Sequence, residues 1–359
     1  MRKILLALLV LASVGPALRA SDFPTVFAHR GCHLNGYVPE NSLDGISMAA
    51  RYGYPTVEID VKFSSDSALV VMHDKTVNRT MVNAGDLSKI ADPVKVSDHS
   101  LKELRENYVL ASSDPAMRKP IPLLEEMLRE CRRCGIVPIL HCKIFEGYEL
   151  AQEILGDDWI AFASEYDICS QVRDLNRNVL ILYSLTKGDK STPEEVMAKL
   201  KALGGRTGIS TMESDILSAE MIKALSSAGY ETQSSIFKTP KEMKAIHDGA
   251  SIILSDFCWF QTKGRKPSAK SSSRGRTVAG DIFEASADEM EFGAMTIEVK
   301  CKGEYDLIVN GKRKYHISHK GMDRETLGFR MYRTSPSVVL EATGDKGRVR
   351  RMKVNFYTL

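Results

Sequence analysis

From Thr25 to Phe257 the chain alternates between short apolar runs of strand length and amphipathic runs of helix length. The strand-like runs are rich in apolar and β-branched residues and cover 25–28, 56–61, 136–142, 159–163, 179–184, 207–211, 231–236 and 251–255. Helix-like runs separate most of them, at 42–52, 123–133, 148–155, 165–175, 193–203, 217–228 and 240–248. Eight strands with helices between them predict an α/β fold of the (β/α)₈ TIM-barrel type.

A doubly wound open α/β sheet is the alternative fold for this alternation. The dinucleotide-binding version of that fold is disfavoured, because no G-x-G-x-x-G motif follows the first predicted strand. Two of the predicted helices have clear start signals. Thr192-Pro193 and Thr239-Pro240 each place a capping threonine directly before a proline suited to the first helical position.

One interval is too long for a simple barrel connection. Roughly 60 residues lie between the strand predicted at 56–61 and the helix predicted at 123–133. They contain another strand-like run, 68–72, and a short helical run from Ser100 to Glu106. We interpret this interval as an insertion after the second barrel strand, at the end of the barrel where loops carry function.

Both ends of the chain differ in composition and hydrophobic pattern from the predicted barrel domain at 21–260. Residues 1–20 combine a basic start, a short apolar run and small residues suited to cleavage, which predicts a signal peptide and an exported, periplasmic or secreted protein. Residues 261–276 are basic and rich in Ser and Gly, as in a linker. Residues 277–359 alternate apolar and polar positions between turn signals, which predicts a small all-β, sandwich-like domain.

The formal net charge of +3 conceals an asymmetry along the chain. Residues 262–359 carry 20 Lys and Arg against 12 Asp and Glu, whereas residues 21–261 carry 26 against 34. The basic C-terminal part would suit contact with an anionic surface, although an ordinary solvated surface is the simpler interpretation. No nucleic-acid partner is expected. The odd number of cysteines, seven, leaves at least one thiol unpaired.

Charged residues follow one predicted strand after another. His29 and Arg30 close the first strand, and Glu58 and Asp60 lie two apart on the second, so that they share one face. His73 closes the extra strand-like run, and His141 and Lys143 close the next barrel strand. The carboxyl ends of barrel strands converge on one mouth, so we expect these side chains to meet there.

These residue types suit metal-assisted chemistry on a phosphodiester. Glu58, Asp60 and His141 are candidate ligands of one divalent metal ion, and carboxylates suit Ca²⁺ or Mg²⁺. Arg30 and Lys143 are candidate phosphate-binding cations. Histidines placed on either side of a phosphorus centre can take one proton and give another. A general acid/base pair is therefore the expected role of the two strand-end histidines that are not candidate metal ligands. These are His29 and His73.

The same segments resemble the glycerophosphodiester phosphodiesterase family. The matching motifs are His29-Arg30-Gly31, Pro39-Glu40-Asn41-Ser42, Glu58-Ile59-Asp60-Val61, His73-Asp74 and Asn78-Arg79-Thr80. The resemblance covers about residues 24–260. It implies a barrel with an insertion after strand two and hydrolysis of small-molecule glycerophosphodiesters to glycerol 3-phosphate and an alcohol. It implies the same roles for His29, His73, Glu58, Asp60, Arg30 and Lys143. Glu40 and Asn41 are expected to serve the start of the first helix, and a direct role in the site is the alternative.

One position departs from the family pattern. The family usually has Glu-x-Lys at the third strand, where this chain has His141-Cys142-Lys143. An imidazole still binds divalent metals but removes one negative charge, which shifts the expected preference toward Mn²⁺ or Zn²⁺. Two alternatives follow from this change. The barrel is a catalytically weakened binding protein, or it cleaves another phosphodiester derived from phospholipid or cell wall.

Overall fold

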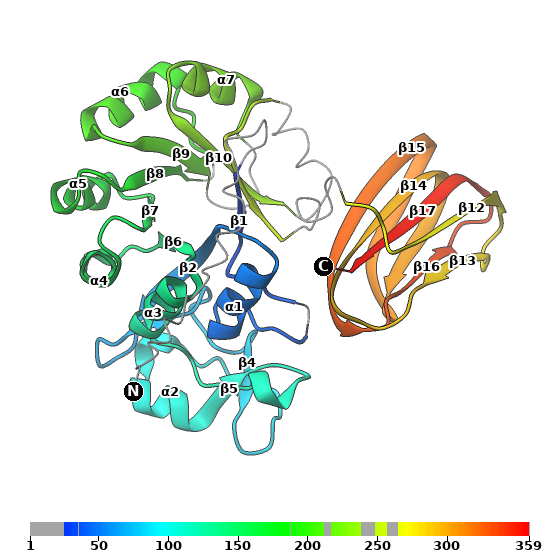
Figure 1. Cartoon of the computed structure of the whole chain (residues 1–359), viewed down its shortest axis with the longest axis horizontal. Coiled ribbons are helices and arrows are strands. Elements are labelled where there is room, and N and C mark those ends of the chain that lie inside the picture. The colour runs from blue at the N-terminus through cyan, green and yellow to red at the C-terminus, as the bar shows by residue number, and fades with distance from the viewer. Residues whose placement is uncertain are drawn as a thin grey trace, which may run out of the picture.

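The computed structural model describes residues 25–34, 36–186, 188–211, 217–237, 248–256 and 265–358. The signal peptide predicted at 1–20 and most of the helix predicted at 240–248 lie outside these ranges. The structure consists of an α/β barrel beside an antiparallel β-domain (Figure 1). None of the helices in the described ranges is both long enough and apolar enough to cross a membrane.

Eight parallel strands close into the predicted barrel. Their order is β1-β11-β10-β9-β8-β7-β6-β2, and pairing between β1 and β2 closes the ring. The strands are β1 (Thr25–Ala28), β2 (Thr56–Phe63), β6 (Val137–His141), β7 (Ile160–Ala163), β8 (Leu180–Leu185), β9 (Thr207–Thr211), β10 (Glu231–Phe237) and β11 (Ile252–Ser255). Each overlaps a strand-like run of the sequence, so the TIM-barrel prediction is confirmed.

Helices cover the outside of the barrel, as Figure 1 shows. They are α1 (Leu43–Arg51), α3 (Leu124–Cys134), α4 (Phe145–Leu155), α5 (Tyr166–Leu175), α6 (Pro193–Leu203) and α7 (Ala219–Ser227). The start of α6 follows its predicted signal, because the Thr192 side chain accepts a hydrogen bond from the Glu195 backbone. A small cluster that includes Phe27, Phe162 and Leu182 fills the barrel, and a larger apolar layer lies between strands and helices.

The insertion after β2 has its own small core. It contains β3 (Leu69–Val71), β4 (Met81–Asn83), α2 (Leu101–Asn107) and β5 (Tyr108–Leu110). Strand β3 pairs antiparallel with the far end of β2, and β4 pairs with β5. Met72, Met81 and Leu104 are among the buried residues of this core. The pairing of β3 with β2 brings His73 back toward the mouth of the barrel.

The C-terminal domain is a six-stranded antiparallel sheet around a single apolar core. Its strands are β12 (Ala269–Thr277), β13 (Ile282–Ser286), β14 (Met290–Val309), β15 (Lys312–Thr334), β16 (Ser337–Ala342) and β17 (Gly347–Thr358). Strand β14 pairs with β15 along one edge and with β17 and then β16 along the other. The all-β domain expected from the sequence is therefore present, and its strands form one hydrogen-bonded sheet.

The predicted linker at 261–276 is too long. Strand β12 begins at Ala269 and pairs with β17, so the second half of that range belongs to the sheet. Asn310-Gly311 forms the turn between β14 and β15, where both residues have positive φ. This is the backbone geometry that two-residue hairpin turns require.

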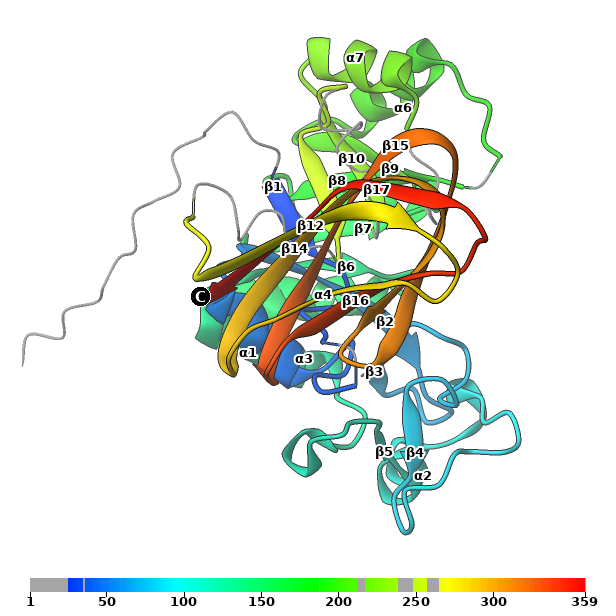
Figure 2. The ribbon, with the colours of Figure 1, turned by 90° about the vertical axis from the view of Figure 1, so that its right-hand side faces the viewer.

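The β-domain packs directly on the barrel. Figure 2 looks onto the β-domain and shows its strands in front of the barrel. The Tyr52 hydroxyl, at the end of α1, lies 2.6 Å from the Met331 carbonyl and 3.0 Å from the Gly293 carbonyl. Tyr332 is buried in the apolar layer of the barrel. The two domains therefore share buried contacts.

Candidate active site

Strands β2 and β6 bring three candidate metal ligands together. The two strands are parallel neighbours, and Asp60 pairs in register with His141. Glu58 lies two residues earlier on β2 and therefore on the same face. Donor atoms of the three side chains lie within 4.8 Å of one another, and both carboxylates are buried. The structure thus brings together the three candidate ligands that the sequence suggested.

The first barrel loop holds these carboxylates in place. The Asn41 side chain donates to Asp60 Oδ2 at 2.9 Å and accepts from the Asp60 backbone at 3.2 Å. The Arg30 backbone donates to Glu58 Oε2 at 2.9 Å. Asn41 was expected to serve the start of α1, but Ser42 is the capping residue there. The correction is that Asn41, with a positive φ, supports the carboxylate cluster.

Without a metal, a proton on His141 would offset the two buried carboxylates. Burial by itself lowers the pKa of His141, but hydrogen bonds and charge attraction from Asp60 and Glu58 outweigh it and raise that pKa to about 9. The pKa of Asp60 is lowered, because His141 and Arg30 oppose the effect of burial. The cluster therefore favours a positive charge at its centre. With the imidazole neutral, two carboxylates and one ring nitrogen fit a divalent cation.

A network of charged side chains runs along the mouth from Arg30 to His73. Arg30 Nη1 donates to Glu40 at 3.0 Å, and Arg79 donates to both Glu40 and Asp74. His73 Nδ1 lies 2.7 Å from Asp74 Oδ1. Hydrogen bonds from Arg79, together with the His73 contact, outweigh burial and lower the pKa of Asp74 to about 2. Glu40 is therefore part of the site network rather than only of the helix start.

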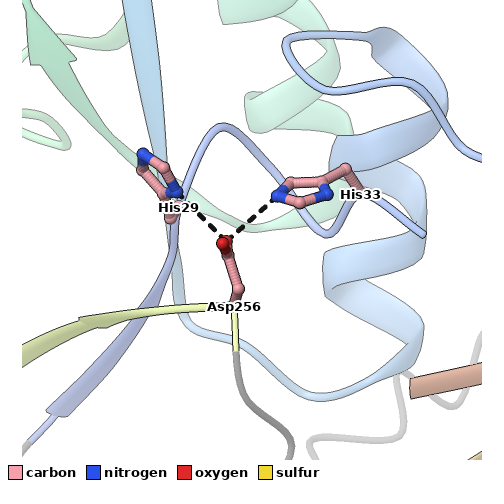
Figure 3. Close-up of side chains that lie close together, drawn as sticks. All are labelled: His29, His33 and Asp256. Carbon is pink, nitrogen blue, oxygen red and sulfur yellow. Dashed lines mark hydrogen bonds and ion pairs between the residues drawn. The ribbon is translucent and has the colours of Figure 1, made fainter. Parts of the chain in front are cut away.

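His29 lies at the carboxyl end of β1 and shares a carboxylate with a second histidine, as Figure 3 shows. His29 Nδ1 lies 3.1 Å and His33 Nε2 3.0 Å from the same Asp256 oxygen. Burial lowers the pKa of His29, but Asp256 outweighs it, and the net effect is to raise that pKa. These three side chains are a second group whose donor atoms cluster closely enough to hold a metal.

Sequence reasoning missed His33 and Asp256. His33 lies in a loop without a recognisable motif, and Asp256 lies one residue beyond the last predicted strand, 251–255. The position of Asp256 directly after β11 is the signal that could have found it, because it repeats the pattern of a charged residue closing a strand. Its partner His29 lies 227 positions away, so local patterns could not predict the contact.

The two predicted cations occupy different surroundings. The Arg30 side chain is mostly buried, and its Nε has no hydrogen-bond partner among the described residues, although Asp60 lies 3.5 Å away. Lys143 is exposed and pairs with Glu165 at 2.7 Å. A third cation, Lys62, lies two residues after Asp60 on β2. Burial lowers the pKa of Lys62, whereas Asp60 and Asp74 act to raise it. Sequence reasoning had not included Lys62, although its spacing from Asp60 was available.

Sequence comparison identifies relatives of the barrel. The chain is 35% identical over 162 residues to glycerophosphodiester phosphodiesterase 1 of Mus musculus, a match covering 43% of this chain and 44% of that protein. It is 34% identical over 104 residues to the glycerophosphodiester phosphodiesterase of Bacillus altitudinis, covering 29% and 38%. The chain thus spans less than half the length of these relatives.

Solved structures share the fold at low sequence identity. A protein from Silicibacter pomeroyi described as a glycerophosphoryl diester phosphodiesterase superposes with a TM-score of 0.55 at 15% identity, covering 67% of this chain and 92% of that one. A phosphodiesterase from Oleispira antarctica, solved with the product sn-glycerol-3-phosphate, superposes at 0.52 with 22% identity, covering 65% and 93%. Residues 29–230, more than half of the chain, match the glycerophosphoryl diester phosphodiesterase family, and the chain therefore belongs to that family.

Proposed function

We propose that the protein is a metal-dependent phosphodiesterase that hydrolyses glycerophosphodiesters to glycerol 3-phosphate and an alcohol. The observation that carries the proposal is the convergence of Glu58, Asp60 and His141 beside Arg30 and His29 at one end of the barrel. Family membership and the names of the relatives support the same reaction.

The ligand cluster would hold one divalent ion through Glu58, Asp60 and His141. When bound, such an ion neutralises charge that builds on the phosphoryl oxygens. Two carboxylates suit Ca²⁺ or Mg²⁺, and the imidazole adds affinity for Mn²⁺ or Zn²⁺. Asn41 and the Arg30 backbone keep the carboxylates oriented.

Cationic side chains with N–H groups available for hydrogen bonding would bind the phosphate. Arg30 Nε is buried without a hydrogen-bond partner in the described part of the chain, so a phosphate oxygen would satisfy it. Lys143 is less constrained and would have to leave Glu165 to contact substrate. Lys62, close to Asp60, is the additional candidate.

Proton transfer is assigned to His29 and His73. Asp256 favours the protonated form of His29, which suits a general acid that gives its proton to the leaving alcohol oxygen as the P–O bond breaks. His73, held by Asp74 and partly exposed, takes the proton of the attacking oxygen as the new P–O bond forms. Exchange with solvent restores both histidines.

The test is an assay of purified protein on glycerophosphocholine with Ca²⁺, Mg²⁺, Mn²⁺ or Zn²⁺, with glycerol 3-phosphate as the readout. His29→Ala and His73→Ala should each reduce the rate by about 100-fold or more. His99→Ala is the matched control, because no side-chain hydrogen bond or ion pair involves this histidine in the described ranges. Absence of product with every metal and several glycerophosphodiesters would favour the binding-protein alternative.

Two further properties belong to the proposal. The protein is exported, on the evidence of the signal-like residues 1–20, and it is periplasmic or secreted. Its basic C-terminal domain contacts an anionic surface. The first property is tested by comparing the mass of the protein before and after secretion, since cleavage of the signal peptide shortens its N-terminus. Sedimentation with anionic vesicles tests the second.

A further inference from the structure

A cavity of about 510 Å³ lies between the barrel and the β-domain. His33, Tyr37 and Asp256 line its barrel side, and residues from both ends of β15 line the other. The two ends of β15 meet here because β14 and β15 curl round. The Asn310 side chain, next to the start of β15, lies within hydrogen-bond range of Thr334 at its end. The wall contributed by the β-domain is thus a feature of this chain outside the matched family region.

Unpaired positive charge gathers in this cavity. Lys312, Lys314 and Arg330 line it, and none has a carboxylate within 4.0 Å among the residues that the structure describes. Burial, and then repulsion from Lys312, lower the pKa of Lys314. Like charges held together in a concave site attract an anion that would relieve them.

Arg330 makes the charge imbalance clearer. Its Nη1 donates to the Cys32 thiol at 2.7 Å, and its guanidinium lies 5.6 Å from the centre of the Tyr54 ring. A thiol and an aromatic face orient the guanidinium without neutralising it. Among the described residues of the lining, Asp256 is the one carboxylate. It attracts the charge of Arg330, but His29 and His33 already share one of its oxygens.

Aromatic rings complete the lining. Tyr37 on the barrel loop and Tyr315 and Phe329 on β15 supply flat apolar surface between the cations. A cavity with rings and a few convergent charges suits an organic anion rather than a bare ion. Phosphorylated sugars and polyols combine the ring or carbon chain with the negative charge that such a lining recognises.

The cavity adjoins the proposed acid/base residue. Asp256 belongs to the cavity wall and also contacts His29 at 3.1 Å. The leaving alcohol must lie near His29 if that residue protonates it. We infer that the cavity holds the alcohol part of the substrate when that alcohol carries its own negative charge, so that the enzyme prefers anionic headgroups. This inference rests on the proposed function.

A matched substrate pair tests the preference. One substrate is glycerophosphoglycerol, in which the alcohol is glycerol. The other is the same diester with glycerol 3-phosphate as the alcohol, so that the two substrates differ by one phosphate group. We expect the double variant Lys312→Ala/Lys314→Ala to lose about 10-fold or more in kcat/KM for the substrate with the anionic alcohol, mainly through KM. The loss should be less than 2-fold for the substrate with the uncharged alcohol. Lys300→Ala/Lys302→Ala is the control, a lysine pair with the same spacing outside the cavity lining. Equal losses on both substrates, or no loss, would overturn the inference.

Direct binding separates this inference from the proposed function. Calorimetry with glucose 6-phosphate, and with glucose as its uncharged match, needs no turnover. We expect glucose 6-phosphate to bind the native protein and the control pair, and to bind Lys312→Ala/Lys314→Ala at least 10-fold more weakly. Lysine-dependent binding without cleavage of any glycerophosphodiester would refute the proposed reaction but keep the anion site. Identical binding to the native protein and the double variant would refute the anion site, whatever the activity.

Discussion

His29 and Asp256 lie 227 positions apart in the chain, yet their side chains are 3.1 Å apart at the carboxyl ends of β1 and β11. Closure of the barrel makes β1 and β11 neighbours, and Ala28 pairs in register with Ser255. The residue after each strand therefore faces the other. This contact sets the orientation and charge of the residue to which we assign proton donation.

Replacing Asp256 by Asn should reduce kcat by about 100-fold, because the amide cannot favour the imidazolium form of His29. Since Asp256 raises the pKa of His29, the alkaline limb of the pH–rate profile should move to lower pH in the variant. Steady-state kinetics across pH give both quantities. His33→Ala, which removes the other histidine from Asp256, serves as the milder control. An Asp256→Asn enzyme with a native rate and profile would remove Asp256 from the mechanism.

Stability of the metal-free protein should fall as pH rises from about 6.5 to 9. The folded pKa of His141 is raised to about 9 from an ordinary value of 6.5, so its stabilising contribution is complete below pH 6.5 and is lost above 9. The expected change in unfolding free energy is on the order of 1–3 kcal/mol. Urea unfolding in the presence of a chelator measures it. In His141→Gln this pH dependence should disappear, and a persistent slope would assign it to other groups.

Replacing His141 by Glu should move metal preference toward Ca²⁺ and Mg²⁺. The change restores the carboxylate usual in the family and adds the negative charge that hard cations favour. Calorimetric titration should show Ca²⁺ binding tighter by about 10-fold and Zn²⁺ binding weaker, relative to the native protein. Glu58→Gln, which removes a ligand without changing shape, should weaken every metal. Unchanged preference in His141→Glu would mean that position 141 does not contact the ion.

Tyr52→Phe should loosen the contact between barrel and β-domain. The Tyr52 hydroxyl donates its proton to the Met331 or the Gly293 carbonyl, and all three groups are buried. Loss of a buried hydrogen bond costs about 1–2 kcal/mol and should lower Tm by a few degrees in scanning calorimetry. Tyr108→Phe on β5 is the matched control, since no described residue makes a hydrogen bond to its hydroxyl. Equal melting of the two variants would count against this contact.

Gly208 on β9 leaves no space for a side chain in the barrel wall. A Cβ there would lie 2.5 Å from the Glu231 carbonyl oxygen and 2.6 Å from its Cβ on the neighbouring strand β10. We expect Gly208→Ala to destabilise the protein by about 1–3 kcal/mol in urea unfolding, because the strands must separate. Gly85→Ala, in open space, should change stability by less than about 0.5 kcal/mol.

The barrel was predictable because its signal is local and repeated. Most of the eight strands are apolar runs, and the helices between them carry their own amphipathic pattern and caps, as at Thr192. Three candidate metal ligands were predictable for a related reason. Glu58 and Asp60 share a face by spacing alone, and His141 ends the strand next to theirs.

Other features depend on contacts that no local pattern contains. Strand β12 is mostly Ser, Lys and Arg, which in isolation is typical of a linker, and it is a strand because β17 offers it a hydrogen-bonding edge. Closure of the barrel brings Asp256 to the histidines that share its carboxylate. The basic cavity forms because the β-domain packs against the barrel. The sequence by itself therefore determined the barrel, the set of candidate ligands and the family. Only the tertiary structure decided that Asp256 contacts His29, because periodicity specifies which face a residue occupies but not which distant residue it contacts.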